Sequence, residues 1–207
     1  IDWLTSQNLH SLLEPSPHVS QLQIDVSLSK TIDLDCLISL PLAVVDFNIR
    51  GLLPGAYCSL IAKCGSKRLW PHLDSMSISH IDDEDTNFVT YFCSQLRRLR
   101  LVRLQMISGL ASVFKQLGSV DHLTIRQIDA LGDESLQQLS ATAKSSITHF
   151  TVKACPRLTS ESKKIVSEMP SLQLLEIQGT PGWSTGRLLG HGRFQTKEEQ
   201  SKNHSAM

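Results

Sequence analysis

The chain has 207 residues, with 20 Lys and Arg against 20 Asp and Glu, so its formal net charge at pH 7 is zero. A neutral chain is not drawn to nucleic acid or to an acidic membrane by long-range electrostatics, which excludes binding driven by an overall positive charge. The hydrophobic fraction is 41%, and the longest apolar stretch, 37–45, is much shorter than the roughly 18 residues that a membrane-spanning helix needs.

The cysteines predict an intracellular protein. They are odd in number and form no CxxC pair, a pattern typical of reduced thiols in the cytoplasm or nucleus. They are Cys36, Cys58, Cys64, Cys93 and Cys155. We expect most of them to be small buried hydrophobic residues. The chain begins at Ile1 without an initiator Met or a signal-like segment, so we expect it to be part of a longer protein, truncated at its N-terminus.

An apolar triplet recurs seven times, with two residues between its first and second members and one between its second and third. In chain order the triplets are Val19/Leu22/Ile24, Leu42/Val45/Phe47, Leu73/Met76/Ile78, Leu96/Leu99/Leu101, Val120/Leu123/Ile125, Ile147/Phe150/Val152 and Leu172/Leu175/Ile177. Their first members lie 23 to 31 residues apart, with a mean of about 25.5. This pattern and period are typical of leucine-rich repeats. The sequence predicts an α/β leucine-rich repeat solenoid, a horseshoe with a parallel concave sheet and outer helices.

Apolar residues at helical spacing lie between the triplets. In chain order these sets are Leu4/Leu9/Leu12/Leu13, Tyr57/Leu60/Ile61/Cys64, Phe88/Val89/Phe92, Leu110/Val113/Phe114/Leu117, Leu136/Leu139/Ala143 and Ile165/Val166/Met169. Asp133 stands where the N-cap of the helix with Leu136 and Leu139 belongs, and either Thr159 or Ser160 begins the last helix. Trp70 lies in an expected surface loop at 65–72. It is expected to pack on the edge of the solenoid, with exposure as a contact residue the alternative.

The repeats define the expected domains. Residues 1–180 form an array of about seven repeats, and residues 181–207 form the remnant of a C-terminal cap and a disordered tail. The triplet does not recur after Pro181, and 197–207 has almost no apolar content with which to form a core.

The sixth repeat carries a more specific resemblance. In Ile147–Glu161 (ITHFTVKACPRLTSE), Cys155 follows the last strand residue by three positions, and an apolar residue and a Thr come after it. This resembles the cysteine-containing leucine-rich repeat typical of F-box proteins, the substrate receptors of Skp–cullin–F-box ubiquitin ligases. The resemblance implies the substrate-binding repeat region of such a receptor. Binding to the ligase adaptor is implied only for a region outside this chain.

Other functions stay open. The same architecture forms the ligand-sensing end of NOD-like innate immune receptors, and a non-enzymatic scaffold is a further alternative. The chain has no HExxH, GxSxG or GK[ST] motif, and its eight histidines show no Cys–His metal spacing. We therefore expect no enzyme activity, no catalytic residues, no metal site and no cofactor.

Side chains alternate along a strand, so the residues around the later triplet members should face the concave side in three columns. The first column is Gln21, Val44, Ser75, Arg98, His122, His149, Leu174; the second is Gln23, Asp46, Ser77, Arg100, Thr124, Thr151, Glu176; the third is Asp25, Asn48, Ser79, Val102, Arg126, Lys153, Gln178.

Repeats four to six place basic residues in these columns without a carboxylate among them. The expected patch consists of Arg98, Arg100, His122, Arg126, His149 and Lys153. Such a patch favours a protein partner with an acidic or phosphorylated segment. The alternative is that these side chains only solvate an exposed sheet face. Nucleic acid is not expected, because aromatic residues are not interleaved with the cations. Asp25 and Asp46 lie at the other end of the arc.

Overall fold

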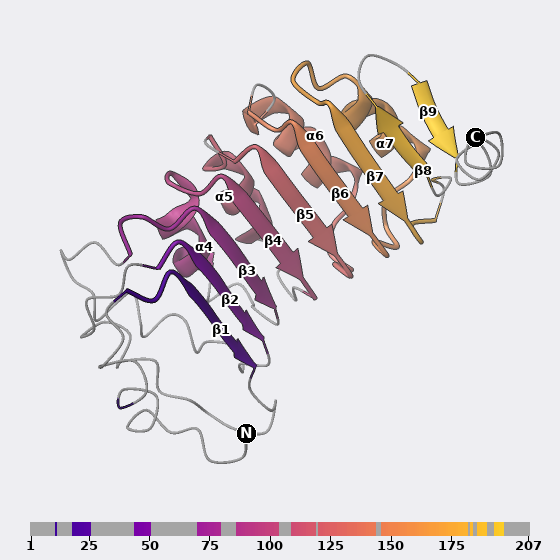
Figure 1. The fold of residues 1–207 in the computed structure, drawn as a ribbon. Helices are drawn as coiled ribbons and strands as arrows, with labels where there is room; N and C mark the ends of the chain where they lie inside the picture. The colour runs from indigo at the N-terminus through magenta and orange to yellow at the C-terminus, as the bar shows by residue number, and fades with distance from the viewer. Residues whose placement is uncertain are drawn as a thin grey trace, which may run out of the picture.

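The computed structural model contains one nine-stranded sheet whose strand order follows the sequence (Figure 1). The strands are β1 (Gln21–Asp25), β2 (Asp46–Arg50), β3 (Ser75–Ser79), β4 (Arg98–Val102), β5 (His122–Arg126), β6 (His149–Lys153), β7 (Leu174–Gln178), β8 (Gly186–Leu189) and β9 (Arg193–Thr196). Strands β1 to β7 are parallel, and β8 and β9 are added antiparallel. The structure describes residues 11, 18–25, 44–50, 70–79, 86–103, 109–118, 120–143, 146–181, 183, 186–189 and 193–196. The protein is therefore α/β with seven parallel strands.

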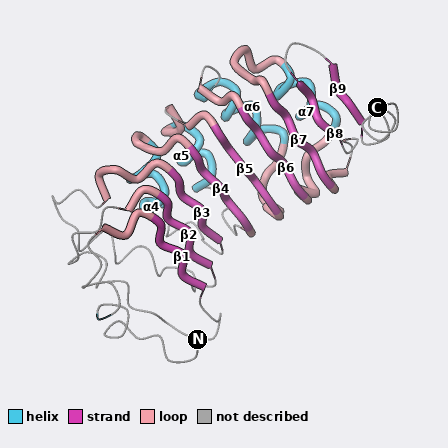
Figure 2. Tube along the Cα trace, viewed as in Figure 1, coloured by secondary structure: helices cyan, strands magenta, loops and turns pink. Residues whose placement is uncertain are grey.

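In the part of the chain that the structure describes, four helices lie on one face of the sheet, each in the connection between two consecutive strands, and consecutive helices pack against each other (Figures 1 and 2). They are α4 (Thr86–Cys93), α5 (Gly109–Lys115), α6 (Asp133–Ala143) and α7 (Ser160–Ser167). These confirm the last four helices predicted from the sequence. The predicted helix around 54–64, the tail at 197–207 and, except for residue 11, the predicted helix around 4–13 lie outside the described residues. Strands β8 and β9 fall in the segment 181–207, where no strand is predicted.

The two faces of the sheet differ in burial. In β4 to β7 the second and fourth residues are buried against the helices, whereas the first, third and fifth are exposed or half-buried. We call the face formed by the first, third and fifth residues of β1 to β7 the open face. The buried triplet members such as Leu99, Leu123 and Phe150 are at most 1% exposed and form one continuous core. The alternation confirms the predicted inward and outward positions of these strands.

The structure corrects the predicted register of the second triplet. Phe47 pairs with Leu22 of β1 and Met76 of β3, which makes it the second residue of its strand and not the fourth. Val44 is fully buried and Val45 is 37% exposed, the reverse of the predicted Leu42/Val45/Phe47 pattern. The prediction is therefore wrong by two residues in this repeat. Asp46 moves to the first column and Asn48 to the second, and Val44 leaves the open face.

The register is fixed where the strands begin. The carbonyl of Asp74, just before β3, accepts hydrogen bonds from the amides of Arg97 (2.9 Å) and Arg98 (3.0 Å) in the next repeat. The carbonyl of Asp121, just before β5, accepts from Thr148 and His149 in the same way. The same double acceptance occurs at every step from β1 to β7, at the carbonyls of Ser20, Val45, Asp74, Arg97, Asp121 and Thr148. It aligns the first residues of all seven strands.

A second ladder lies where the strands end. The residues that follow β4 to β7 all adopt left-handed backbone conformations, with φ between 51° and 62°: Arg103, Gln127, Ala154 and Gly179. The amides of the first three donate to the last carbonyl of the next strand, as Ala154 does to Gln178 at 2.8 Å. Only glycine adopts this conformation without steric cost. The repeated corner therefore costs free energy at three of the four positions.

Trp70 packs inside the structure and is only 3% exposed. Its ring lies 4.6 Å from that of Phe47 and stacks on that of Phe92 at 5.8 Å, measured between ring centroids. Its carbonyl accepts a hydrogen bond from the side-chain amide of Gln95. Trp70 is therefore packed and not exposed, so the alternative of an exposed contact residue is wrong.

Two helix N-termini are joined by one carboxylate. Asp133, the first residue of α6, accepts hydrogen bonds from the amide (3.0 Å) and hydroxyl (2.6 Å) of Thr159 and from the hydroxyl of Ser162. Thr159, one of the two residues predicted to begin the last helix, is the N-cap of α7, and its hydroxyl accepts a hydrogen bond from the amide of Glu161. Burial alone would raise the pKa of Asp133, but the hydrogen bonds from Ser162 and Thr159 outweigh it and hold the pKa below its ordinary value of 3.8.

The alternation predicts unequal costs for neighbouring truncations in β5. Leu123→Ala should destabilise the protein by about 2–5 kcal/mol, because it leaves a cavity between repeats. Thr124→Ala on the open face should change stability by no more than about 0.5 kcal/mol. Denaturant unfolding of both variants measures the difference, and equal losses would contradict the assigned faces.

The left-handed corners predict opposite effects of exchanging Gly and Ala. Gly179→Ala should cost about 1 kcal/mol through its backbone alone, because the added Cβ meets no atom within 4 Å. Ala154→Gly, at the same corner one repeat earlier, should stabilise the protein by up to about 1 kcal/mol. Thermal unfolding of the two single variants tests the pair, and shifts of the same sign would refute the account of the corner.

The Asp133 bridge predicts a pH-dependent stability. Asp133→Ala should cost about 1–2 kcal/mol at pH 7, whereas Glu134→Ala, one residue later and exposed, should cost no more than about 0.5 kcal/mol. Because the folded-state pKa of Asp133 is lowered, its contribution is complete above the ordinary value and is lost as the pH falls through the folded value. Urea unfolding from pH 7 down to pH 3 should show the two stability curves converging in acid. A constant difference would contradict this.

Candidate recognition face

All six residues of the predicted basic patch lie on the open face. Arg98, His122 and His149 are the first residues of their strands and are paired neighbours across β4, β5 and β6. Arg126 and Lys153 are likewise neighbours as fifth residues of β5 and β6. Arg100 is the third residue of β4, beside Thr124. The structure thus brings the six together, in three rows that run across the strands.

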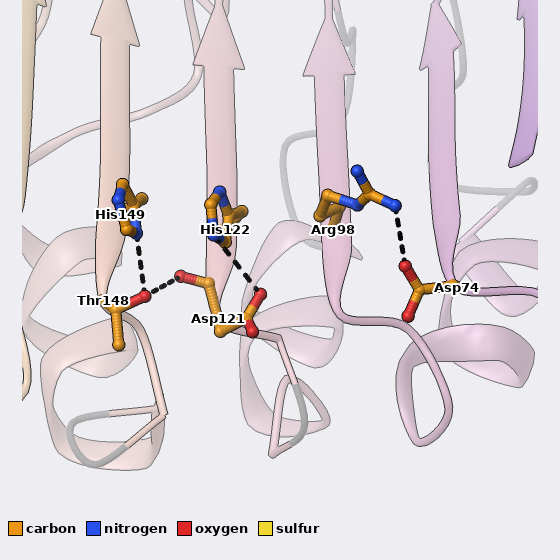
Figure 3. Close-up of polar contacts among 6 residues, drawn as sticks. All are labelled: Asp74, Arg98, Asp121, His122, Thr148 and His149. Carbon is orange, nitrogen blue, oxygen red and sulfur yellow. Dashed lines mark hydrogen bonds and ion pairs between the residues drawn. The ribbon is translucent and has the colours of Figure 1, made fainter.

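A carboxylate that the three columns do not include lies beside the basic patch. Asp74, just before β3, forms an ion pair with Arg98 at 2.9 Å (Figure 3). The two side chains are 31% and 57% exposed, so the pair is worth no more than about 1 kcal/mol. It nevertheless occupies Nη2 of the Arg98 guanidinium, which donates a hydrogen bond to Oδ2 of Asp74. The expectation of cations without a carboxylate is therefore wrong at this point, and the residue just before each strand is the sequence position that shows it.

The two histidines stack on each other. The rings of His122 and His149 are parallel within 10°, with centroids 4.1 Å apart. Nδ1 of His149 lies 2.9 Å from the hydroxyl of Thr148, which donates to the carbonyl of Asp121 at 3.1 Å (Figure 3). Because the Thr148 hydroxyl proton is used there, its oxygen can only accept from His149, which places a proton on Nδ1. The Asp121 carboxylate lies 3.9 Å from Nε2 of His122.

A groove of about 530 Å³ crosses the open face from β1 to β5. Its lining includes Asp46 and Asn48 on β2, Ser75 and Ser77 on β3, and Arg98, Arg100, His122 and Thr124 on β4 and β5. The hollow follows from side-chain size, because the two serines of β3 are short and stand between longer residues of β2 and β4. The sequence did not predict this groove. The sequence feature that indicates the groove is the run of serines in the third repeat. It becomes visible only when β2 is aligned in the corrected register, which places Asp46 and Asn48 beside Ser75 and Ser77.

Two polar atoms in the groove are buried without a hydrogen-bond partner among the described residues: Nε of Arg100 and Oδ1 of Asn48. They are the third residues of β4 and β2, and Ser77 of β3 lies between them in the register. One is a donor and the other an acceptor. A buried polar atom left without a partner costs free energy, so a ligand that supplies the missing partners is favoured at this position.

The two described cysteines, Cys93 and Cys155, are buried. Burial raises the pKa of the Cys93 thiol to about 12 and also raises that of Cys155. Such thiols are poor nucleophiles at neutral pH. Cys155 is fully buried in the position that Ile128 and Thr180 take in the neighbouring repeats. It therefore belongs to the repeat core.

Within the described ranges no three metal-ligating side chains are grouped as a metal ion requires, and no helix has the length and apolarity to traverse a bilayer. Neither a comparison of the sequence with protein-family models nor one with curated proteins gives a match. The resemblance of the Cys155 repeat to F-box proteins therefore stays a prediction from the sequence.

Proposed function

We propose that the chain is a leucine-rich repeat solenoid that recognises a protein partner on its open face. One observation carries this proposal: the described helices, α4 to α7, lie on the other face, and the open face of the seven parallel strands holds a polar groove of about 530 Å³. The repeat period and the one-strand-per-repeat order support the solenoid. Such arrays bind partners along an extended sheet surface.

The partner's chemistry follows from the side chains of β4 to β6. Arginine pairs with a carboxylate or phosphate through two parallel hydrogen bonds, and Lys153 and Arg126 add charge in the fifth-residue row. We therefore propose a partner segment that is acidic or phosphorylated. Following the Cys155 repeat, we further propose that this partner is a substrate of an F-box-type ubiquitin ligase, in which this chain selects the substrate and a region outside it binds the adaptor.

Charge reversal on the open face should abolish partner binding. The variant Arg98→Glu with Arg100→Glu inverts the charge of β4 and leaves the buried Leu99 and Leu101 intact. The matched control is Lys115→Glu with Lys164→Glu, two exposed lysines of α5 and α7. The three proteins serve as baits in extracts of the cells that produce the protein. A partner retained by the wild type and the control should be lost from the open-face variant, and added salt should weaken its binding.

A partner that binds all three baits equally, each shown by circular dichroism to be folded, would contradict recognition by the open face. The ligase role has its own measurement. Depletion of the protein from cells should raise the abundance of its partner and lower the partner's ubiquitination. Unchanged abundance and ubiquitination would leave a recognition module without a ligase, such as a sensor array or a scaffold.

A further inference from the structure

The groove has two chemically opposite sides, and this deepens the proposed function, on which the inference rests. The β2 side presents hydrogen-bond acceptors, the carboxylate of Asp46 and Oδ1 of Asn48. The β4 side presents donors, the guanidinium groups of Arg98 and Arg100. The short Ser75 and Ser77 of β3 form the hollow between them. A ligand that fits must carry an anion at one end and a cationic donor at the other.

The two arginines differ in their availability. Arg98 is held by Asp74 at 2.9 Å, so an incoming anion competes with a carboxylate already in place (Figure 3). Nε of Arg100 is buried, with no hydrogen-bond partner in the described part of the chain. Oδ1 of Asn48, across the hollow, is in the same state. Arg100 and Asn48 are therefore the two residues that gain most from a ligand.

The spacing of the strands sets the length of the ligand. Neighbouring strands lie about 4.8 Å apart, so β2 and β4 are about 10 Å apart and β1 and β5 about 19 Å. A peptide across the strands has no strand edge to pair with, so its backbone stays solvated, as in a polyproline II helix that rises about 3.1 Å per residue. In that conformation residues three apart point to the same side about 9 Å from each other, and about six residues span the groove.

We propose that the groove binds a peptide segment of a partner protein in which an acidic or phosphorylated residue pairs with Arg100 and a basic residue about three positions away pairs with Asp46 and Asn48. A peptide is the occupant that matches both sides. It carries two opposite charges at this separation and can donate and accept hydrogen bonds between them. The recognised motif is therefore bipolar, whereas the basic patch alone selects only for an anion.

Selection from a library of random nine-residue peptides displayed on phage tests the motif with the full chain as target. The wild type should enrich peptides with Asp or Glu about three positions from Lys or Arg. Arg100→Gln should lose the acidic preference and keep the basic one, and Asp46→Asn should do the reverse. Lys164→Gln on α7 is the control and should enrich the same peptides as the wild type. The affinity of the best wild-type peptide should fall about tenfold or more in each groove variant.

Replacement of the acidic residue of that peptide by phosphoserine should preserve or tighten binding, and the tighter of the two forms identifies the natural anion. Replacement by Ala should reduce binding to that of the Arg100→Gln variant. If Arg100→Gln does not fold, Arg100→Lys keeps the charge without the fork of donors and should show a smaller loss.

Three results would overturn the bipolar motif: no enriched peptides, enriched peptides without a charge pair, or equal affinity for the wild type and a folded Arg100→Gln. The charge-reversal experiment distinguishes failure of the bipolar motif from failure of the proposed function. If charge reversal of Arg98 and Arg100 abolishes partner capture but the selections show no pairing, the open face recognises a partner by other contacts. If capture survives the reversal, the open face itself is not the recognition surface.

Discussion

The common register of the seven parallel strands is the constraint on which the rest of the structure depends. At each step one carbonyl just before a strand accepts two amides from the following repeat, with N–O distances between 2.8 and 3.0 Å. A one-residue slip of a strand would break both bonds and move the core side chains of that strand to the open face. The pairing therefore fixes at once the core, the position of the helices and the rows of polar residues across the strands.

The rows bring residues that are distant in sequence together on one surface. Arg98, His122 and His149 are separated by more than 20 residues in sequence but are direct neighbours across the sheet. The groove likewise depends on a cross-strand sequence of sizes, in which short serines follow Asp46 and Asn48 and precede two arginines. The open-face residues of β1 to β7 are equally spaced from strand to strand. The distance between two charged residues in the groove is therefore set by the number of strands between them.

Much of the frame was predictable from sequence, because apolar periodicity directly reflects burial. The Leu96/Leu99/Leu101 triplet and the helix residues Phe88 and Phe92 are buried as predicted. The prediction for the second repeat is wrong because Val44 and Val45 are both apolar, so apolarity alone does not choose between the two registers. Only the pairing of Phe47 with Leu22 and Met76 decides between them.

The site was less predictable than the frame. The patch residues followed from the alternation, but the Asp74–Arg98 pair and the groove depend on contacts between repeats that no single repeat encodes. The left-handed corners after β4 to β6 were not predictable from the sequence either, because Arg103, Gln127 and Ala154 are not glycines.

Distances between spin labels on the open face test the sequential parallel order most directly. Labels at cysteines replacing Gln23 and Thr124, or Gln23 and Glu176, are placed in a chain whose Cys36, Cys58 and Cys64 are serines; Cys93 and Cys155 are buried and do not react. The labels stand on third residues four and six strands apart, so the account predicts Cα separations of about 19 and 29 Å. A Gln23–Glu176 distance no longer than that from Gln23 to Thr124 would contradict the strand order and the groove built on it.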